Sequence, residues 1–430
     1  MYLNRINKNF IKFNIKSVSN SHIIYIILVF FQYFAMSLTA SNGTMYLLSR
    51  GISIQWVGYL GTVGVITILL FEFPTGLIAD RLGSGTSVAV SLIVRGIAAF
   101  LTIFCYGPFL FSIITIMHSV GATCYSGAAE AWIFSRDSTI KHNMANFFSN
   151  IFFLTGASKV LGGWLGAFLG SIELRIPFVI ASAILVLIST LFIFYDMITK
   201  EKYINKMNKR EKSIIRILLF DAKNSFAFMK KEKDIFWLMI SGVFFIIFCS
   251  IPLVYWQPFF YNTVQSIKSL GWIWVGFIFF NMCGNLFVKS KTLQKINDIH
   301  LFWITICLCG ITLLLSAVLD KNFLISVFFF CSYQLFLGIL GPIRAKILNR
   351  KISDANRASI LSLISFSESA GSIFSLSLFG YLSSFMPLHL IFGLSTVPLV
   401  FALIIAMKIA YRFKFLEGSA NTHRVNLINY

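Results

Sequence analysis

Five ionisable side chains fall within or at the edges of long apolar runs, where they could exchange protons or bind a charged solute. Glu368 is the best candidate for proton exchange, because a carboxyl group without a counterion in a low-dielectric environment favours its neutral form. A charge at such depth costs several kcal/mol unless it is paired or hydrated, so embedded charges mark functional positions by default. The five residues are Glu72, Arg95, Glu130, Lys159 and Glu368.

Mutual pairing is the competing explanation for these charges. Arg95 or Lys159 could neutralise Glu368 or one of the other two acids. Glu130 falls about one turn from the end of its apolar run, so its carboxylate could also reach the membrane surface. A direct contact between Lys159 and Glu368 requires that their two helices face each other. The sequence is compatible with pairing and with proton exchange.

The elements that carry these charges are twelve apolar runs. The chain is 57% hydrophobic and 12% charged, whereas about a quarter of the residues of a soluble domain are charged. Each run reaches the roughly 20 helical residues that cross about 30 Å of hydrocarbon; the first is expected over 23 to 47 and the fourth over 109 to 134. Lipid offers no partner for free backbone groups. The sequence therefore predicts an all-α membrane protein with twelve transmembrane helices.

The runs divide into two groups of six. The expected divisions are an N-terminal tail (1–22), a six-helix half (23–195), a linker (196–234), a second six-helix half (235–409) and a C-terminal tail (410–430). The linker is too polar to span a membrane, and a surface helix is expected around 214 to 228. Gly76 has a counterpart in Gly284, and 284 minus 76 gives an offset of 208 residues. This weak similarity indicates two related halves.

The net charge of +20 reports topology. Of the 36 Lys and Arg residues, 30 fall on alternate loops and tails and 4 on the intervening loops. Basic residues concentrate in the cytoplasmic loops of membrane proteins, so both termini are expected in the cytoplasm. No basic face on a soluble domain is apparent, which argues against nucleic-acid binding.

Residues 72 to 83 combine small residues and opposite charges at the end of the second run. This stretch resembles the signature loop between the second and third helices of the major facilitator superfamily of transporters, Gly-x-x-x-Asp-Arg-x-Gly followed by two basic residues. Ser84 and Gly85 replace that basic pair here. The residues that match the pattern are Gly76, Asp80, Arg81 and Gly83.

The resemblance implies a gate. The loop arginine, Arg81, would bridge to an acid at the end of the fourth helix, which is Asp137 in this chain. Asp80 would meet the start of the eleventh helix near Ala358, where the helix dipole favours an anion. Such contacts would latch the outward-facing state. A solvated charge cluster at the membrane surface is the alternative.

Two further patterns carry the resemblance. Residues 126 to 132 of the fourth run are similar to a pattern found in bacterial drug and metabolite exporters, and they include Glu130. A glycine-rich fifth helix is associated with antiporters of the superfamily, although the Gly-Pro step of that family motif is absent here. Small residues four apart let a neighbouring helix approach closely. They are Gly162, Gly166 and Gly170 on the fifth run and Ser367, Gly371 and Ser375 on the eleventh.

In the superfamily the substrate cavity is lined by the first, fourth, seventh and tenth helices. The arginine expected in the fourth-helix motif is missing, and His118 occupies that neighbourhood. Tyr255 and Trp256 could instead be aromatic anchors at the membrane surface. The expected cavity residues are Gln32, Tyr33, His118, Trp256, Gln257, Tyr333 and Gln334.

Enzymatic chemistry is not expected. All seven cysteines fall in apolar runs, where thiols behave as small hydrophobic groups, so neither a disulfide nor a metal site is predicted. The chain contains no His-Glu-x-x-His, Gly-x-Ser-x-Gly or nucleotide-binding Gly-x-x-x-x-Gly-Lys-Ser/Thr pattern. These motifs carry metalloprotease, hydrolase and ATP-dependent chemistry. We therefore expect no cofactor and no enzyme activity.

The resemblance implies a secondary active transporter of the bacterial cytoplasmic membrane that works as a monomer. The expected partners are a small-molecule substrate, protons and the lipid bilayer. We expect proton-coupled efflux of a small amphipathic compound, such as a drug or a peptide antibiotic, by alternating access. Uptake of a metabolite by the same fold and a transporter-like membrane sensor are the alternatives.

Overall fold

A computed structural model describes residues 19–137, 140, 144–200, 233–352 and 357–408. Within these ranges the chain forms helices and no strands. Twelve of the described helical segments are long and apolar enough to cross a membrane. The fold class and the number of spans predicted from the sequence are confirmed. The surface helix expected around 214 to 228 lies outside the described residues.

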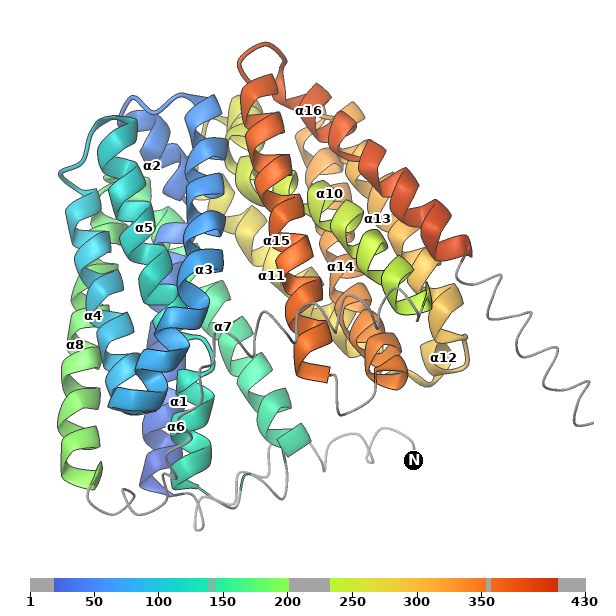
Figure 1. The fold of residues 1–430 in the computed structure, drawn as a ribbon. Helices are drawn as coiled ribbons and strands as arrows, with labels where there is room; N and C mark the ends of the chain where they lie inside the picture. Colours follow the sequence, from blue (N-terminus) through green and yellow to red (C-terminus); the bar gives the residue numbers. More distant parts are fainter. Residues whose placement is uncertain (1–18, 138–139, 141–143, 201–232, 353–356, 409–430) are drawn as a thin grey trace, which may run out of the picture.

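The described helices of the first half make six spans (Figure 1). In chain order they are α1 (Asn20–Ala40), α2 (Gly43–Ser49), α3 (Ile54–Leu82), α4 (Ser84–Thr102), α5 (Gly107–Tyr125), α6 (Ala128–Arg136), α7 (Met144–Gly170) and α8 (Ile176–Lys200). The fourth span consists of α5 and α6 together.

The second half repeats this arrangement after residue 232. Its helices are α10 (Lys233–Val264), α11 (Ile267–Phe287), α12 (Lys291–Gln294), α13 (Asp298–Val318), α14 (Phe323–Lys351), α15 (Arg357–Leu382) and α16 (Leu388–Ser395). The last span continues to Lys408.

Polar side chains fix several helix starts. Ser19 accepts a hydrogen bond from the backbone N–H of His22, 3.2 Å away, at the start of α1. Ser53 caps α3 in the same way, and Asn322 caps α14. These side chains satisfy N–H groups that have no partner within the helix. Polar residues between apolar runs therefore help to fix where these three spans begin.

Two spans are interrupted where the sequence predicted continuity. The first was expected to reach residue 47, but α1 ends at Ala40 and a separate helix follows. Between the two helices, the buried Asn42 side chain donates to the Gly166 carbonyl at 2.9 Å and so holds this connecting segment against α7. The fourth was expected to run unbroken to residue 134. Gly127 adopts a φ of 72°, a left-handed conformation that glycine tolerates, so α5 and α6 are separate.

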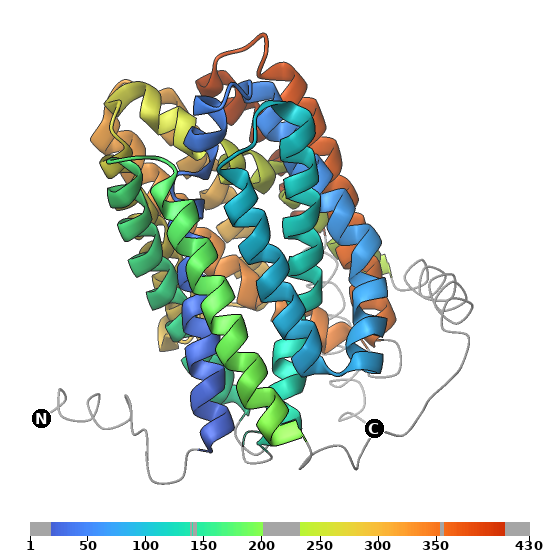
Figure 2. The same cartoon turned by 90° about the vertical axis from the view of Figure 1, so that its left-hand side faces the viewer.

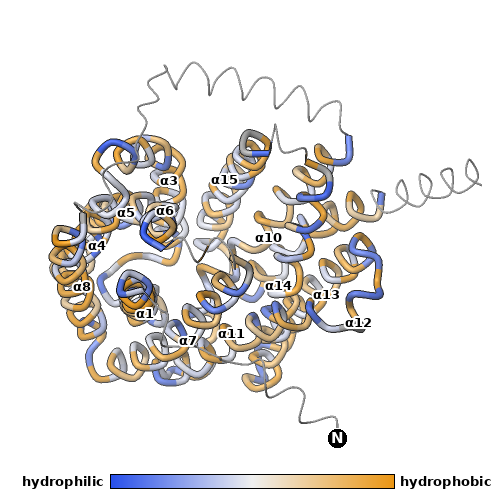
Figure 3. Tube along the Cα trace, turned by 90° about the horizontal axis from the view of Figure 1, so that it is seen from below, coloured by the Kyte–Doolittle hydropathy of each residue, from blue (hydrophilic) through white to orange (hydrophobic). Residues whose placement is uncertain are grey.

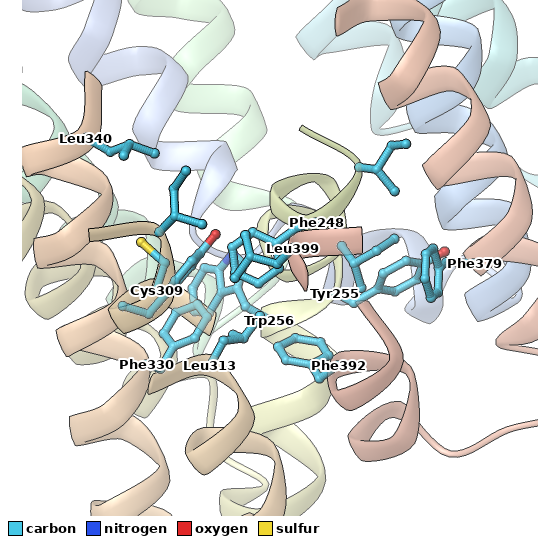
Figure 4. Packing of buried hydrophobic residues seen from close by; sticks show 14 of the residues in the cluster. Phe248, Tyr255, Trp256, Cys309, Leu313, Phe330, Leu340, Phe379, Phe392 and Leu399 are labelled. Atoms are coloured by element: carbon cyan, nitrogen blue, oxygen red, sulfur yellow. The ribbon is translucent and has the colours of Figure 1, made fainter. Parts of the chain in front are cut away.

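The two halves pack their helices in the same order. α1 lies against α7 as α10 lies against α15, and α5 packs on α3 and α4 as α14 packs on α11 and α13. Figure 2 shows α4 and α8 side by side on the outside of the first half. In the second half, a core of large side chains that includes Phe248, Trp256 and Phe330 fills the space between helices (Figure 4).

The two halves separate towards one end of the bundle (Figure 1). We call this the basic end; α1 begins there, α3 and α8 end there, and it carries Arg81 and Lys346. At the opposite end, α3 and α15 touch through Gly58 and Gly380, and Thr62 lies 3.1 Å from Ser377 between hydroxyl oxygens. The structure is therefore closed at the opposite end.

Exposure supports an opening at the basic end. Glu72 and Gly76 on α3 are exposed, as are Leu361 and Phe366 on α15. By contrast, α7 and α11 keep contact along much of their length, from Ala167 beside Gly271 to the basic end, where Lys289 reaches Ser149. Figure 3, seen from below, shows hydrophobic segments along the outer helices of both halves.

Candidate functional site

A cavity of about 400 Å³ lies within the first half, bounded by α1, α2, α4, α5 and α8. Most of its lining is apolar, and side chains from five helices contribute. Ligand sites typically have this character, with a few polar groups in an apolar pocket. The main lining residues are Met36, Thr39, Leu47, Arg95, Ala98, Ala99, Thr102, Phe111, Ile114, Thr115, His118 and Phe178.

Arg95 supplies the charge of this cavity. The residue is 8% exposed, and its Nη2 donates to the sulfur of Met36 at 2.6 Å. Its Nε is enclosed and has no hydrogen-bond partner. A thioether is a weak acceptor, and no carboxylate of the described residues lies within 4.0 Å of the guanidinium. The cation is therefore poorly compensated by the protein.

Helix packing fixes the position of Arg95. A Cβ added to Gly121 of α5 would lie 2.5 Å from Cγ of Arg95, so the glycine makes room for its methylene groups. Ser91 donates to the Gly121 carbonyl at 2.5 Å and ties α4 to α5. Arg95 is thus held against a close helix contact while it lines the cavity.

His118 is the second polar group of the cavity that sequence reasoning selected. Its Nε2 lies 3.3 Å from the Met36 sulfur that also accepts from Arg95. The structure therefore brings together one expected embedded charge and one expected cavity residue around a methionine. Met36 carried no signal in the sequence, because an apolar residue in an apolar run does not stand out.

Lys159 takes a different environment. Its Nζ lies 5.0 Å from the centre of the Tyr33 ring, a cation–π contact. Its backbone carbonyl accepts from the indole of Trp274 at 2.8 Å, across the junction of the halves. The expected cavity residue Tyr33 is thus paired with an embedded charge, and Lys159 is not paired with Glu368.

Glu368 forms an ion pair with Arg344. The two side chains are 21% and 19% exposed. A Cβ on Gly242 of α10 would lie 2.6 Å from Oε1 of Glu368 and 2.4 Å from Nη2 of Arg344. Three helices of the second half, α10, α14 and α15, therefore converge on the pair.

The partner of Glu368 was not expected. Arg95 and Lys159, both in the first half, were the expected partners, and Arg344 was among the 30 bases assigned to loops and tails. The structure places Arg344 inside α14, seven residues before its last residue, Lys351. The tenth apolar run extends to this arginine, which was the available signal.

The remaining two embedded acids, Glu130 and Glu72, differ in burial. Glu130 is half-buried in the first turn of α6, where the helix dipole stabilises a negative charge. Glu72 is exposed on α3. Glu130 therefore has a local electrostatic role that follows from the break at Gly127.

The gate residues are apart in this state. Asp80 and Arg81 are exposed and make no ion pair with the described residues. Asp137 is buried and accepts a hydrogen bond from the Ser19 hydroxyl at 2.7 Å. It also lies 3.6 Å from a ring nitrogen of His22. The structure does not bring Arg81 to Asp137, and the proposed latch stays a prediction for a state closed at the basic end.

A buried acid explains why the second of the two expected basic residues after the signature loop is a glycine, Gly85. Asp196 accepts from the Trp132 indole at 2.7 Å and from Arg136 at 2.6 Å. A Cβ on Gly85 would lie 2.5 Å from Oδ1 of Asp196. A basic side chain cannot occupy that position without displacing the carboxylate. Asp196 was expected in the linker, but α8 extends to Lys200.

Gln257, expected in the cavity, joins the two halves at the opposite end. Its Nε2 donates to the Ala40 carbonyl at 2.7 Å, and its Oε1 accepts from the backbone N–H of Thr44 at 2.9 Å and of Met45 at 3.4 Å. Because Gln257 lies on α10, these bonds hold α10 against the loop and helix that follow α1. Gln257 therefore lies at the interface between the two halves.

The other expected cavity residues are buried among side chains. Trp256 packs against Trp274 and Tyr333 against Phe248. Gln32 is 3% exposed, and its Oε1 has no hydrogen-bond partner. The fourth, Gln334, is also buried, and its backbone carbonyl accepts from Asn281.

The glycine stripe on the fifth span packs against α1. An added Cβ on Gly162, Gly166 or Gly170 would meet the Phe34 carbonyl at 2.4 Å, the Leu38 carbonyl at 2.1 Å or the Asn42 amide at 2.2 Å. On the eleventh span, the Ser375 hydroxyl donates to the Ile247 carbonyl of α10 at 2.7 Å. The small residues thus bring α7 to α1 and α15 to α10.

Comparisons with a family profile and with a related protein both identify the same transporter superfamily. The sequence profile of the Major Facilitator Superfamily matches residues 25–333. An uncharacterised MFS-type transporter of Bacillus subtilis (strain 168), YxaM, is 26% identical over 388 residues, which are 87% of this chain and 91% of that protein.

Solved structures share the fold. The nucleoside transporter NupG superposes with a TM-score of 0.75 at 14% identity, covering 92% of this chain and all of that chain. The POT family transporter PepTSo superposes with a TM-score of 0.69 at 10% identity, covering 93% and 99% of the two chains. The protein is therefore a multi-pass membrane protein, and it belongs to the major facilitator superfamily of transporters.

Proposed function

We propose that the protein exports a small amphipathic compound, such as a drug or a peptide antibiotic, in exchange for protons by alternating access. The observation that carries this proposal is the cavity of about 400 Å³, whose apolar lining is interrupted by Arg95 and His118. An amphipathic molecule would place its apolar part on that lining and its polar part on these two groups.

The positions of the inter-half contacts support alternating access. The halves are held at the opposite end by Gln257 and by the contacts of α3 with α15. At the basic end, Asp80 and Arg81 are exposed. Rocking of one half against the other, as in parallel-repeat transporters, would close the basic end and bring these charges to Asp137 and to the start of α15.

The Arg344–Glu368 pair supports proton coupling. Protonation of Glu368 would remove its attraction for Arg344 and leave the guanidinium to find another partner. Because α10, α14 and α15 all meet at this pair, its rupture would change the packing of three helices. A proton taken up at Glu368 would thereby favour one arrangement of the second half over the other.

The distribution of basic residues sets the proposed orientation. With 30 of 36 Lys and Arg residues on alternate loops and tails, the basic end would face the cytoplasm, together with both termini. In that orientation the structure would correspond to an inward-open state in a bacterial inner membrane. One chain contains both halves and the cavity, so a monomer would suffice.

The direction of transport separates the main proposal from its alternatives. The exporter-like stretch from 126 to 132 and the glycine stripe of α7 support export. The same fold serves uptake and, in principle, sensing, and the similarity to NupG and PepTSo extends only to the fold.

Accumulation of labelled amphipathic compounds in cells with and without the gene tests the direction. Loss of an exporter raises the accumulation of at least one compound, and a Glu368→Gln protein expressed at the wild-type level should not restore export. Lower accumulation after deletion would establish uptake and overturn the proposal. Unchanged accumulation of every compound would instead favour a sensor.

A further inference from the structure

We infer that the transported compound is an organic monoanion whose carboxylate binds Arg95 within the cavity of the first half. This inference rests on the proposed transport function and specifies its substrate class. Two independent observations carry it, namely the Arg95 guanidinium, whose Nε has no hydrogen-bond partner, and the lining of the cavity beside it.

The first observation is a buried cation that the protein leaves without a strong acceptor. Arg95 is more than nine-tenths buried, its Nε has no partner, and its one hydrogen bond is to a thioether sulfur. Glu130, an acid of the same half, also lies beyond 4.0 Å of every cation in the described residues. A carboxylate stabilises a buried arginine, because the planar guanidinium can donate two parallel, charge-assisted hydrogen bonds to its oxygens.

The second observation is that the cavity lies directly at this cation. Arg95 and His118 line it together, so a carboxylate bound there can accept from the guanidinium and from an imidazole N–H. The sulfur of Met36 contacts both Arg95 and His118. Because the methionine side chain is flexible, it can move away when a stronger hydrogen-bond acceptor binds. The site is therefore preformed apart from the movement of one thioether.

The charge of the lining selects a monoanion. Arg95 is the only Lys or Arg among the described residues that line the cavity. A phosphate monoester carries roughly −1.5 to −2 charges near neutral pH, which would leave one negative charge uncompensated in an apolar space. A carboxylate brings one charge for one guanidinium, so it fits the lining better than a phosphate does.

The apolar lining selects the rest of the molecule. Ala98, Ala99, Phe111, Ile114 and Phe178 offer no hydrogen bonds from their side chains. A hydrophobic body gains free energy there in proportion to the surface that it buries. The expected ligand is thus a carboxylic acid with an alkyl or aromatic body.

Octanoate and octanamide test the inference, because they share an apolar chain and differ in charge. With purified full-length protein in nanodiscs of zwitterionic lipid, octanoate should raise the melting temperature and octanamide should not. Arg95→Gln should weaken octanoate binding about tenfold or more, since a charge-assisted hydrogen bond is lost. Arg175→Gln, at an exposed arginine of the opposite end, is the matched control and should bind as the wild type does.

Three results would overturn the inference: equal shifts for octanoate and octanamide, undiminished octanoate binding in Arg95→Gln, or a shift that appears only with octyl phosphate or anionic lipid. Should Arg95→Gln fail to fold, Ala99→Phe provides a second variant that fills the cavity and leaves the charge. Octanoate binding should then be lost, and its retention would also count against the site.

Flux of labelled octanoate into proteoliposomes separates this inference from the proposed function. Binding at Arg95 without flux would leave the site in place and refute transport of the ligand. Flux of neutral compounds with no response to octanoate would leave transport in place and refute the anion site.

Discussion

Gln257→Ala is expected to shift the protein away from the state seen here. Gln257 makes two well-formed hydrogen bonds between the halves, to the Ala40 carbonyl at 2.7 Å and from the Thr44 N–H at 2.9 Å. Each neutral bond contributes about 0.5 to 1.5 kcal/mol, so the pair favours closure of the opposite end by about 1 to 3 kcal/mol. Loss of that energy changes the ratio of the two states by about 5- to 150-fold.

Distances between spin labels at the basic end measure this shift. Cysteines in place of Leu82 and Lys295, both exposed and one in each half, report the separation of the halves there. The seven native cysteines are buried or half-buried, so labelling favours the introduced sites. In the Gln257→Ala background the longer distances, which belong to the state open at the basic end, should lose population to shorter ones.

Gln55→Ala is the matched control. Gln55 lies at the same end of the bundle, but its side chain donates to Tyr59 within its own helix at 2.9 Å. Its removal should leave the distance distribution unchanged. If Gln257→Ala leaves the distribution as it is in the wild type, or if both variants change it equally, the hydrogen bonds of Gln257 do not control the opposite end.

Three further changes, one of them with a control variant, have expected outcomes. Gly166→Leu should lower the melting temperature of the purified protein by several degrees, because a side chain there meets the backbone of α1 at 2.1 Å, whereas Gly76→Ala, with nothing within 4 Å, should leave it unchanged. Gly85→Arg, which restores a basic residue of the family pattern, should also lower it by displacing the Asp196 carboxylate; equal stability would show that the helices can move apart there. Asp80→Asn should slow turnover and leave substrate affinity nearly unaltered, and normal turnover would remove the latch.

The number of spans followed from the sequence because it depends on local properties. The length of an apolar run is enough to predict a membrane-crossing helix, and the weak repeat between Gly76 and Gly284 indicated two halves. The breaks after Ala40 and at Gly127 were not predicted, because they depend on tertiary contacts and on backbone conformation. The buried hydrogen bond of Asn42 to α7, for example, joins residues far apart in the chain.

The site residues were predicted only in part, because some of their properties are local and others depend on tertiary contacts. A charge inside an apolar run is visible in one dimension, which is why Arg95 and Glu368 were selected. The partners of these charges depend on which sides of the helices pack together. The sequence therefore did not predict Arg344 as the partner of Glu368 or Met36 as the partner of Arg95. Gln257 was assigned to the cavity from its helix alone, whereas its register places it at the contact between halves.

The most direct test of proton-coupled transport is the internal pH of proteoliposomes that contain the purified protein, with the membrane potential clamped. When a compound identified by the accumulation assay is added outside, wild-type protein should change the internal pH as the compound moves. The Glu368→Gln protein should still exchange labelled compound across the membrane but leave the pH constant. Movement of the compound through the wild-type protein without any change in pH would contradict the account.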